Sequence, residues 1–282
     1  MNSKSKNKNS NGASGAGINV NGVNGNGAGV NVNGINGVYG VNDVGINEGC
    51  VVSLLASTPD AKKVAFSAIR SCYSPGTARE LFDHEFDKYE AKVGKNGEEH
   101  DSDRLIHEIV NHGHTSTLEH VSFTFSVSGI SRACLAQLTR HRIGWSYSVQ
   151  SQRYVKQSTE SKHGGFEYVL PDLGYVDAKS DVYGVSSRTC RSVMKAAMEQ
   201  AQIYYDMLVK WGVKAEDARM VLPQAATCNL VITCNLRAFL DGYRKRALND
   251  HAQTEIRVLF EKMRDAIVAK EPWIEALTKG DE

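Results

Sequence analysis

The sequence predicts a helix-rich α+β fold, and two observations carry that prediction. Residues 121–127 alternate between apolar and polar side chains, as a half-buried strand does. Segments near 186–211 and 251–269 have the length and end signals of helices, including Gly212 and Pro272 just beyond them. The chain also lacks the GxGxxG and GxxxxGK[ST] signatures, so neither a Rossmann fold nor a P-loop is expected.

The N-terminal 49 residues differ in composition from the rest of the chain. They are mainly Asn, Gly, Val and Ser in loose repeats, with almost no large apolar side chains. Such a segment buries too little surface to offset the entropy of ordering it. We therefore expect a disordered tail at 1–49 and a folded domain at 50–282.

From Cys50 onward, the pattern alternates between strands, helices and short loops. Thr58 before Pro59 predicts a helix start, with Thr58 as the cap and Pro59 as the first helical residue. The predicted strands are residues 50–57, 121–127 and 166–171. The predicted helices are residues 58–72, 102–112, 130–143, 186–211, 230–247 and 251–269. Residues 85–103 are polar and charged, and they are predicted to form a loop or an insertion.

Composition excludes several classes of protein. The net charge of +1 offers no global field for nucleic acid or an anionic membrane. No apolar run approaches the roughly 20 residues of a membrane span, and no signal peptide is evident, so a cytoplasmic protein is expected. The six cysteines are scattered and form no CxxC pair, which favours buried, reduced thiols over disulfides or a zinc ribbon.

Residues 120–159 are free of Asp and Glu, although the chain holds 32 acidic residues. Gln137, Arg140 and His141 have the spacing of one helix face, and a predicted loop rich in hydroxyls and amides follows, ending in Arg153. Arginine forks match phosphate oxygens, and hydroxyl and amide groups complete such a site. The segment therefore predicts a site for a phosphorylated heterocyclic ligand; the alternative is a solvated basic face.

Four ordered blocks across residues 50–275 resemble the flavin-dependent thymidylate synthase family (ThyX). The blocks are Arg140-His141-Arg142 with Ser151-Gln152-Arg153-Tyr154, the segment HGHTSTLEH at 112–120, Arg219 with Leu222-Pro223, and Asn235-Leu236-Arg237 with Arg246, His251 and Glu255. The chain departs from the family pattern by one extra residue before Ser151, one more before His251, and Asp241 where relatives carry Asn or His. These departures suit the branch that methylates UMP as well as dUMP in polyoxin-type antibiotic pathways.

The resemblance implies a ThyX-like, non-Rossmann domain with a central, mostly antiparallel sheet. It implies C5-methylation of a uracil nucleotide, dUMP or UMP, with FAD as cofactor, NADPH as reductant and methylene-tetrahydrofolate as carbon donor. It also implies a homotetramer with shared active sites, and neither nucleic acid nor membrane as a partner. The catalytic residues implied are Arg246, His114 and Tyr154. The flavin-binding residues implied are Ser116, Glu119, Arg140, Arg142, Ile143, Asn235, Arg237 and His251. The nucleotide-binding residues implied are Gln137, Arg140, Gln150, Ser151, Gln152, Arg153, Arg219 and Arg246.

Two other classes of function stay open at the level of the sequence. His112, His114, Glu119 and His120 are residue types that ligate zinc, which would suit a zinc-dependent hydrolase. Their spacing does not place them on one helix face, so no metal site is expected. The simpler interpretation of His112 and His120 is that they are buried, hydrogen-bonded histidines. The basic segment alone would also suit a non-catalytic nucleotide-binding module.

Overall fold

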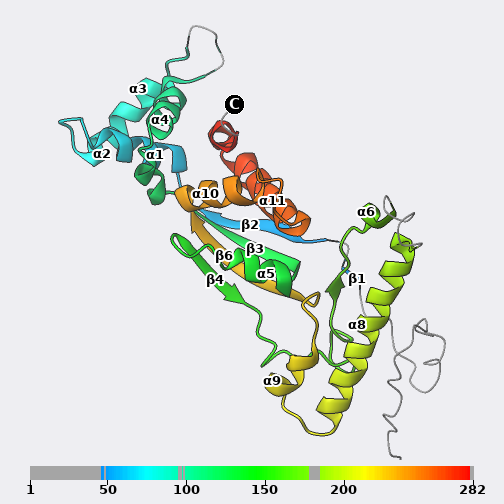
Figure 1. Ribbon diagram of the computed structural model, residues 1–282. Helices are drawn as coiled ribbons and strands as arrows, with labels where there is room; N and C mark the ends of the chain where they lie inside the picture. Colours follow the sequence, from blue (N-terminus) through cyan, green and yellow to red (C-terminus); the bar gives the residue numbers. More distant parts are fainter. Residues whose placement is uncertain (1–45, 48, 95–96, 98, 178–184, 280–282) are drawn as a thin grey trace, which may run out of the picture. The chain divides into compact units, whose positions relative to one another are not determined.

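The computed structural model describes residues 46–47, 49–94, 97, 99–177 and 185–279. The predicted tail lies outside these residues up to position 45, whereas Ile46–Asn47 form the short strand β1. The chain combines a four-stranded antiparallel sheet with helices that cover one of its faces, which confirms the predicted α+β class (Figure 1). No helix in the described part of the chain is both long and apolar enough to cross a bilayer.

The main sheet has the strand order β2-β3-β6-β4. Its strands are β2 (Val51–Ser57), β3 (Ser122–Ser131), β6 (Thr227–Asn235) and β4 (Trp145–Val149). Strand β3 pairs with both β2 and β6, and its alternate residues Phe123, Phe125 and Val127 are buried. This is the predicted strand, and its alternation arises because successive side chains of a strand point to opposite faces.

Three helices pack on the buried face of the sheet: α5 (Arg132–Leu138), α10 (Leu236–Arg246) and α11 (Thr254–Lys270). Figure 1 shows α10 and α11 lying across the strands. Helix α11 contributes Ile256, Leu259, Phe260 and Met263 to the same core as the phenylalanines of β3. Gly242 of α10 allows this packing, because a Cβ there would lie 2.7 Å from the Phe260 ring.

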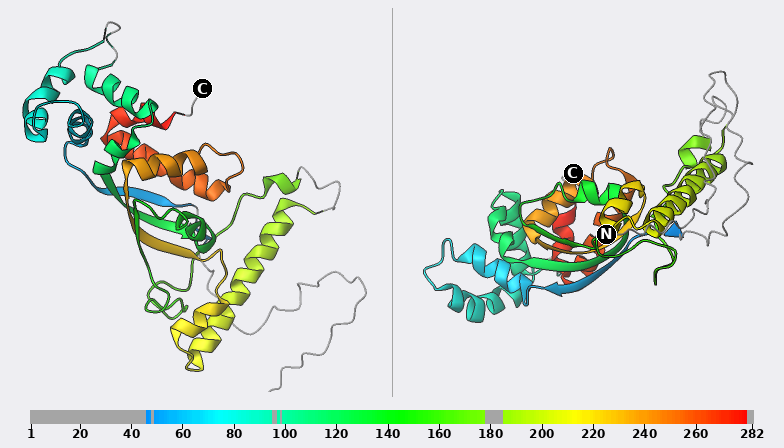
Figure 2. Two further views of the ribbon diagram at one scale, coloured as in Figure 1. Left: turned by 60° about the vertical axis from the view of Figure 1, so that its left-hand side comes forward. Right: turned by 90° about the horizontal axis from the view of Figure 1, so that it is seen from below.

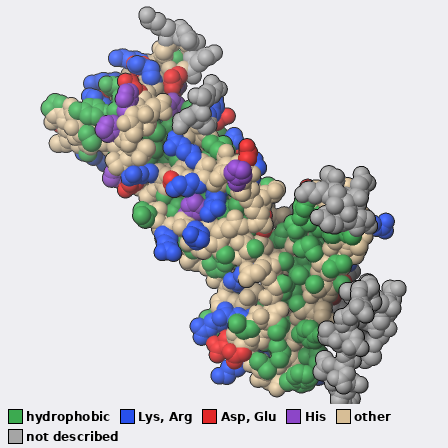
Figure 3. Space-filling model, in the orientation of Figure 1, with side chains coloured by type: hydrophobic (Ala, Val, Ile, Leu, Met, Phe, Trp, Pro, Cys, Tyr) green, Lys and Arg blue, Asp and Glu red, His purple; other side chains and the backbone are tan. Residues whose placement is uncertain are grey.

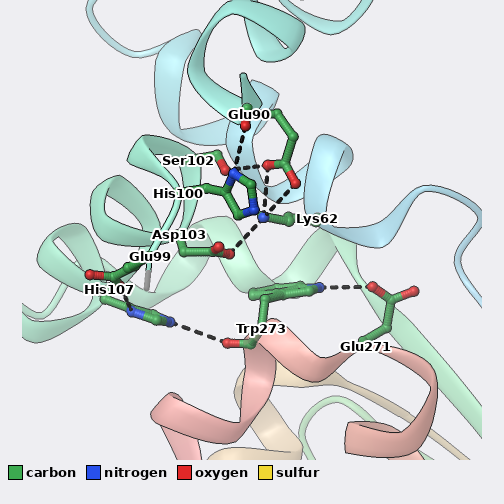
Figure 4. Close-up of polar contacts among 9 residues, drawn as sticks. All are labelled: Lys62, Glu90, Glu99, His100, Ser102, Asp103, His107, Glu271 and Trp273. Carbon is green, nitrogen blue, oxygen red and sulfur yellow. Dashed lines mark hydrogen bonds and ion pairs between the residues drawn. The ribbon is translucent and has the colours of Figure 1, made fainter. Parts of the chain in front are cut away.

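A helical segment follows β2. It contains α1 (Ala61–Arg70), α2 (Ala78–Glu80), the π-helix η2 (Leu81–Glu85), α3 (Phe86–Glu90) and α4 (Asp101–Asn111). A polar cluster joins three of these helices, because Lys62 of α1 pairs with Glu90 of α3 at 2.8 Å and with Asp103 of α4 at 2.7 Å (Figure 4). His107 of α4 contacts the carbonyl of Trp273 in the 3₁₀ helix η5 (Pro272–Thr278), which links this helical segment to the C-terminal end of the domain.

Two predictions in this region are wrong. The first helix begins at Ala61 and not at Pro59, because Thr58 continues the pairing with β3 through its N–H and hydroxyl bonds to Ser122. Asp60 then makes the turn into the helix with a positive φ of 50° and no side-chain cap. The segment 85–103 is not a loop throughout, because π-helix η2 and helix α3 occupy its start and α4 begins at Asp101.

A long helix, α8 (Ser187–Lys210), packs beside a smaller second core (Figure 2). Phe166, Tyr168, Met198 and Ala226 form this core. Strand β5 (Tyr168–Val169) pairs in parallel with β1, and the short helices α6 (Gly174–Asp177) and α9 (Ala215–Ala218) with 3₁₀ helix η4 (Arg219–Val221) flank α8. Gln202 of α8 is fully buried and accepts a hydrogen bond from the Phe166 N–H at 2.9 Å.

The largest error concerns residues 230–247, which were predicted as one helix. Residues 227–235 are strand β6, with Cys228, Leu230, Ile232 and Cys234 buried in alternation, and helix α10 begins only at Leu236. When an apolar strand continues directly into a helix, the pattern of apolar residues does not show where the strand ends and the helix begins. Asn235 marks that boundary, since its side chain caps the helix by accepting from the Ala238 N–H at 2.8 Å.

Three smaller differences bear on the site. Helix α5 covers 132–138 and not 130–143, because β3 extends to Ser131 and the helix ends at the Thr139 cap. The predicted hydroxyl-rich loop contains strand β4, held by five register pairs with β6. The predicted strand at 166–171 is reduced to the two residues of β5.

The cysteines follow the prediction in part. All six are free thiols; Cys50, Cys134, Cys228 and Cys234 are buried, whereas Cys72 is exposed and Cys190 is intermediate. Burial raises the pKa of the Cys228 thiol to about 11 and raises that of Cys134 further. Buried thiols of this kind are poor nucleophiles at neutral pH.

Candidate active site

The C-terminal end of α5 carries the first group of predicted site residues. The helix begins firmly, because Ser131 caps the Cys134 N–H at 3.0 Å and is itself held by the Glu255 carboxylate at 2.6 Å. It ends at Leu138, so Gln137 lies on its last turn while Arg140 and His141 follow in the turn beyond it. The prediction that all three share a helix face is therefore wrong for the last two.

Arg246 at the end of α10 joins this group from 109 residues further along the chain. Its Nη2 donates to the Gln137 carbonyl at 3.3 Å, and its Nε donates to Nε2 of His141 at 3.1 Å. The Gln137 amide also bonds to the side chain of Gln253, just before α11. The structure thus brings together predicted nucleotide-binding residues from α5 and α10.

The second group lies at the N-terminal end of α10. Arg237 on its first turn forms an ion pair with Glu119, which belongs to the 3₁₀ helix η3 (Thr115–His120). Asn235 caps the same helix, and Gly144 lies so close that a Cβ there would sit 2.7 Å from Asn235 Nδ2. Gly144 also has a positive φ of 75°, so only glycine lets the chain after Arg142 turn here.

The third group lies between the loop that follows β4 and helix α9. Arg153 donates to Glu216 with Nε at 3.2 Å and Nη2 at 3.1 Å. Arg219 donates to the Glu216 carbonyl at 3.0 Å, so the two predicted nucleotide-binding arginines meet at one residue of α9. The side chains of Arg153 and Glu216 are 52% and 39% exposed, which leaves this pair open to an anion.

The remaining predicted residues surround these groups. Ile143 is 93% exposed and Tyr154 80% exposed, and Arg153 stacks over the Tyr154 ring. Gln152 is buried, and Ser151 accepts from the Arg153 N–H. The other exposed members are His114, Ser116, Arg140, Arg142 and His251. Figure 3 shows Lys, Arg and His side chains over the α10 region and a mixed basic and acidic group near α9.

The histidine segment before β3 does not form a metal centre. His112 and His120 are exposed, so their plain reading as buried residues is wrong, and His112 bonds through Nδ1 to the Glu108 carbonyl at 2.7 Å. Within the ranges that the structure describes, no three His, Cys, Asp or Glu side chains are grouped to hold a metal ion. Glu119 is engaged by Arg237 instead.

A pocket of about 700 Å³ opens beside the N-terminal end of α5, and it meets the first group of site residues only at Gln253, the hydrogen-bond partner of Gln137. Val169, Leu170, Met194 and Val258 give it a largely apolar lining, with Gln253 and Glu255 at its polar edge. The predicted residues are not among those that line it. We therefore place the candidate site at the three residue groups, not at this pocket.

Sequence reasoning missed two residues that the structure places in the site. Glu216 faces Arg153, but an acid in a charged stretch carries no signal that it will meet a residue 63 positions away. His141 stands inside the quoted RHR block, and it was assigned to neither ligand. Its contact with Arg246 depends on the packing of α10 against α5, which local spacing does not encode.

Comparisons with known proteins identify the family of this chain. A family model described as thymidylate synthase complementing protein (Thy1) matches residues 53–273. The flavin-dependent thymidylate synthase of Clostridium tetani is 36% identical over 231 residues, covering 76% of this chain and 81% of that protein. The enzyme of the same name from Geobacter sulfurreducens is 39% identical over 212 residues, covering 75% and 79%.

Two solved structures share the fold. Thymidylate synthase X from Helicobacter pylori, with FAD and dUMP, has a TM-score of 0.56 at 24% identity and covers 82% of this chain and 100% of that one. PolB, a UMP/dUMP methylase from Streptomyces cacaoi bound with 5-Br UMP, has a TM-score of 0.60 at 22% identity and covers 84% and 98%. At these identities, the two structures bear on the architecture of the chain.

Proposed function

This chain belongs to the flavin-dependent thymidylate synthase family, and on that premise we propose that it is an FAD-dependent enzyme that methylates C5 of a uracil nucleotide. The observation that carries the proposal is the pairing of family-type residues from distant segments: Arg246 with Gln137, and Arg237 with Glu119. The zinc-hydrolase and simple binding-module alternatives account for neither pairing.

The side chains of the second group have the chemistry that FAD binding requires. Arg237 supplies a guanidinium, Arg142 another exposed cation, and the neighbouring Ile143 an apolar side chain that is almost wholly exposed. Cations suit a pyrophosphate, and an uncovered apolar side chain suits a flat ring. When bound and reduced by NADPH, the flavin would supply the hydride that turns the transferred carbon into a methyl group.

The chain's own part is to hold and polarise the nucleotide. Arg153 and Arg219 offer two guanidinium groups for its phosphate, and Arg246 offers N–H groups to a ring carbonyl. Donors fixed in advance stabilise negative charge that develops on such a carbonyl, and this makes C5 of the ring more nucleophilic. We propose methylene-tetrahydrofolate as the carbon donor and NADPH as the reductant on the resemblance to the family.

A shared site in a homotetramer is part of the same proposal. Val193, Tyr204 and Trp211 of the α8 region are 58%, 52% and 69% exposed, and Figure 3 shows hydrophobic side chains across this part of the surface. Exposed apolar patches of this kind suit contact with another copy of the chain. Light scattering on the flavin-loaded protein tests the assembly, and a monomer at micromolar concentration would contradict it.

UMP is the second candidate substrate beside dUMP. The spacer between Arg142 and Ser151, expected to be a loop, holds strand β4, which exposes the hydroxyl groups of Ser146 and Ser148. A hydroxyl beside the sugar would give a ribose 2′-OH a partner, whereas apolar contacts alone reject an added hydroxyl by only roughly a hundredfold. The ratio of kcat/KM for dUMP and UMP on one preparation decides this, and a preference for dUMP above about a thousandfold would exclude UMP.

The whole function is tested with purified protein. We expect a yellow preparation with a flavin spectrum, and methyl transfer to dUMP that depends on methylene-tetrahydrofolate and NADPH. Stoichiometric zinc without flavin would support the hydrolase instead. Nucleotide binding with neither flavin nor turnover would leave the binding module.

A further inference from the structure

We propose that His141 is a positioning residue: its neutral imidazole accepts a hydrogen bond from Arg246 and thereby aims the guanidinium at the nucleotide. The proposal rests on the proposed function, in which Arg246 polarises the uracil ring. His141 itself is assigned no contact with a ligand. It acts through Arg246 alone.

Two contacts fix one edge of the Arg246 guanidinium. Nε donates to Nε2 of His141 at 3.1 Å, and Nη2 donates to the carbonyl of Gln137 at 3.3 Å. An arginine has five N–H donors in a rigid plane, so holding two of its nitrogens sets the direction of the others. Without the His141 contact, the guanidinium would keep only its carbonyl bond and would rotate about it.

The geometry also fixes the protonation state of His141. Arginine has no acceptor, so Nε2 of His141 must present its lone pair and the ring proton must lie on Nδ1. Burial lowers the pKa of His141, and the neighbouring cations Arg246 and Lys245 lower it further, while Asp241 opposes them. Each of these charged neighbours lies on α10.

Uncharged aromatic side chains from β4 and α11 pack against the imidazole and hold it in place. Its ring lies 5.8 Å from the ring of Trp145 in β4 and 5.6 Å from that of Phe260 in α11. The backbone carbonyl of His141 accepts from the Tyr147 hydroxyl at 2.8 Å. A ring fixed in this way makes a rigid acceptor for Arg246.

Protonation of His141 would remove the acceptor and place two cations in contact. Activity should therefore fall as the pH drops through the lowered pKa of His141, which lies below the ordinary histidine value of about 6.5. The loss is expected to appear mainly in kcat, since misdirected polarising groups slow the chemical step. A structural role alone would not tie the loss to one titration.

Two substitutions separate the acceptor from the packing. His141→Phe keeps a ring between Trp145 and Phe260 but removes the acceptor, so kcat/KM should fall roughly tenfold to a hundredfold, as for misplaced catalytic groups. His141→Gln keeps an acceptor oxygen near the Nε2 position that does not titrate, so it should restore much of the loss and abolish the acid limb of the pH profile. His163→Gln, at an exposed histidine outside the site, is the control.

One readout does not depend on turnover. Imidazole ¹⁵N shifts of the flavin-loaded protein near neutral pH should show the proton of His141 on Nδ1, and His141→Phe should weaken binding of a uracil nucleotide measured by calorimetry. If wild type binds the nucleotide but methylates nothing, the proposed function fails while this readout still tests the contact. A proton on Nε2, or a His141→Phe variant with wild-type kcat, binding and pH profile, would overturn the positioning role.

Discussion

Arg237 donates a hydrogen bond to Glu119, and this one contact joins the start of helix α10 to the 3₁₀ helix that precedes β3. Both residues were assigned to the flavin site from motifs 118 positions apart. Their side chains are 49% and 46% exposed, so the pair is open to a ligand. A polar ligand that binds here would exchange this pair for contacts of its own.

Arg237→Ala should lower flavin content while the protein stays folded. Hydrogen bonds to charged groups contribute about 1.5–3 kcal/mol, which corresponds to roughly a tenfold to hundredfold rise in the Kd for FAD. Absorbance of the purified protein and titration with FAD measure this. Arg244→Ala, at an exposed arginine of the same helix, should bind FAD as wild type does; equal loss in both variants would contradict the assignment.

Glu216→Gln should bind a uracil nucleotide more tightly than wild type. The Glu216 carboxylate pairs with Arg153, so a phosphate that binds Arg153 has to compete with this carboxylate. Exposed pairs of this kind contribute about 0.2–1 kcal/mol, so the gain in affinity should not exceed about fivefold. Calorimetry at low and high salt measures it, with Asp217→Asn as the matched control. Arg153→Ala should act in the opposite direction, and tighter binding by that variant would refute the phosphate site.

Ser151→Ala should keep measurable activity. The Ser151 hydroxyl accepts a bond from the Arg153 N–H at 3.3 Å, and the proposed chemistry does not need it as a nucleophile. A neutral hydrogen bond contributes about 0.5–1.5 kcal/mol, so a loss in kcat/KM of up to roughly tenfold is expected. Mass spectrometry after reaction with a 5-halogenated nucleotide tests this, and a covalent adduct on Ser151 would contradict the prediction.

Glu90→Gln should lower the thermal stability of the domain in a pH-dependent way. Partial burial raises the pKa of Glu90, but hydrogen bonds from Lys62 and Ser102 together outweigh that effect and bring the pKa below its ordinary value. A carboxyl with a lowered folded-state pKa contributes stability that is present above its unfolded pKa, about 4.3, and is lost as the pH falls through the folded value.

The measurement for Glu90 is the Tm of both proteins by calorimetry at pH 7 and near pH 3. The difference between wild type and Glu90→Gln should be largest at neutral pH and should shrink in acid. Glu275→Gln, at an exposed carboxylate of η5, is the control for loss of a charge alone. A difference that does not change with pH would show that the Lys62–Glu90 pair adds nothing through its charge.

The RHR, SxRY and HGHxTxxEH blocks identified the family because they reflect the chemistry of the ligands. Strand β3 and helices α8 and α11 were also predictable, because period-2 alternation, a cap residue and a glycine or proline stop are local signals. The boundary between β6 and α10 was not predictable, since Leu230 to Asn235 read equally as either element. Pairing with β3 and β4 decided it.

The sequence by itself determined which residue types the site holds, namely arginines, amides and hydroxyls in an acid-free segment. Only the tertiary structure decided which of them meet. Arg246 reaches His141 because α10 packs against the same core as the end of α5, and Glu216 reaches Arg153 because α9 lies beside the loop that follows β4. Contacts between residues 105 and 63 positions apart depend on the packing of whole elements, whereas spacing along the chain reports only on neighbours within one helix or strand.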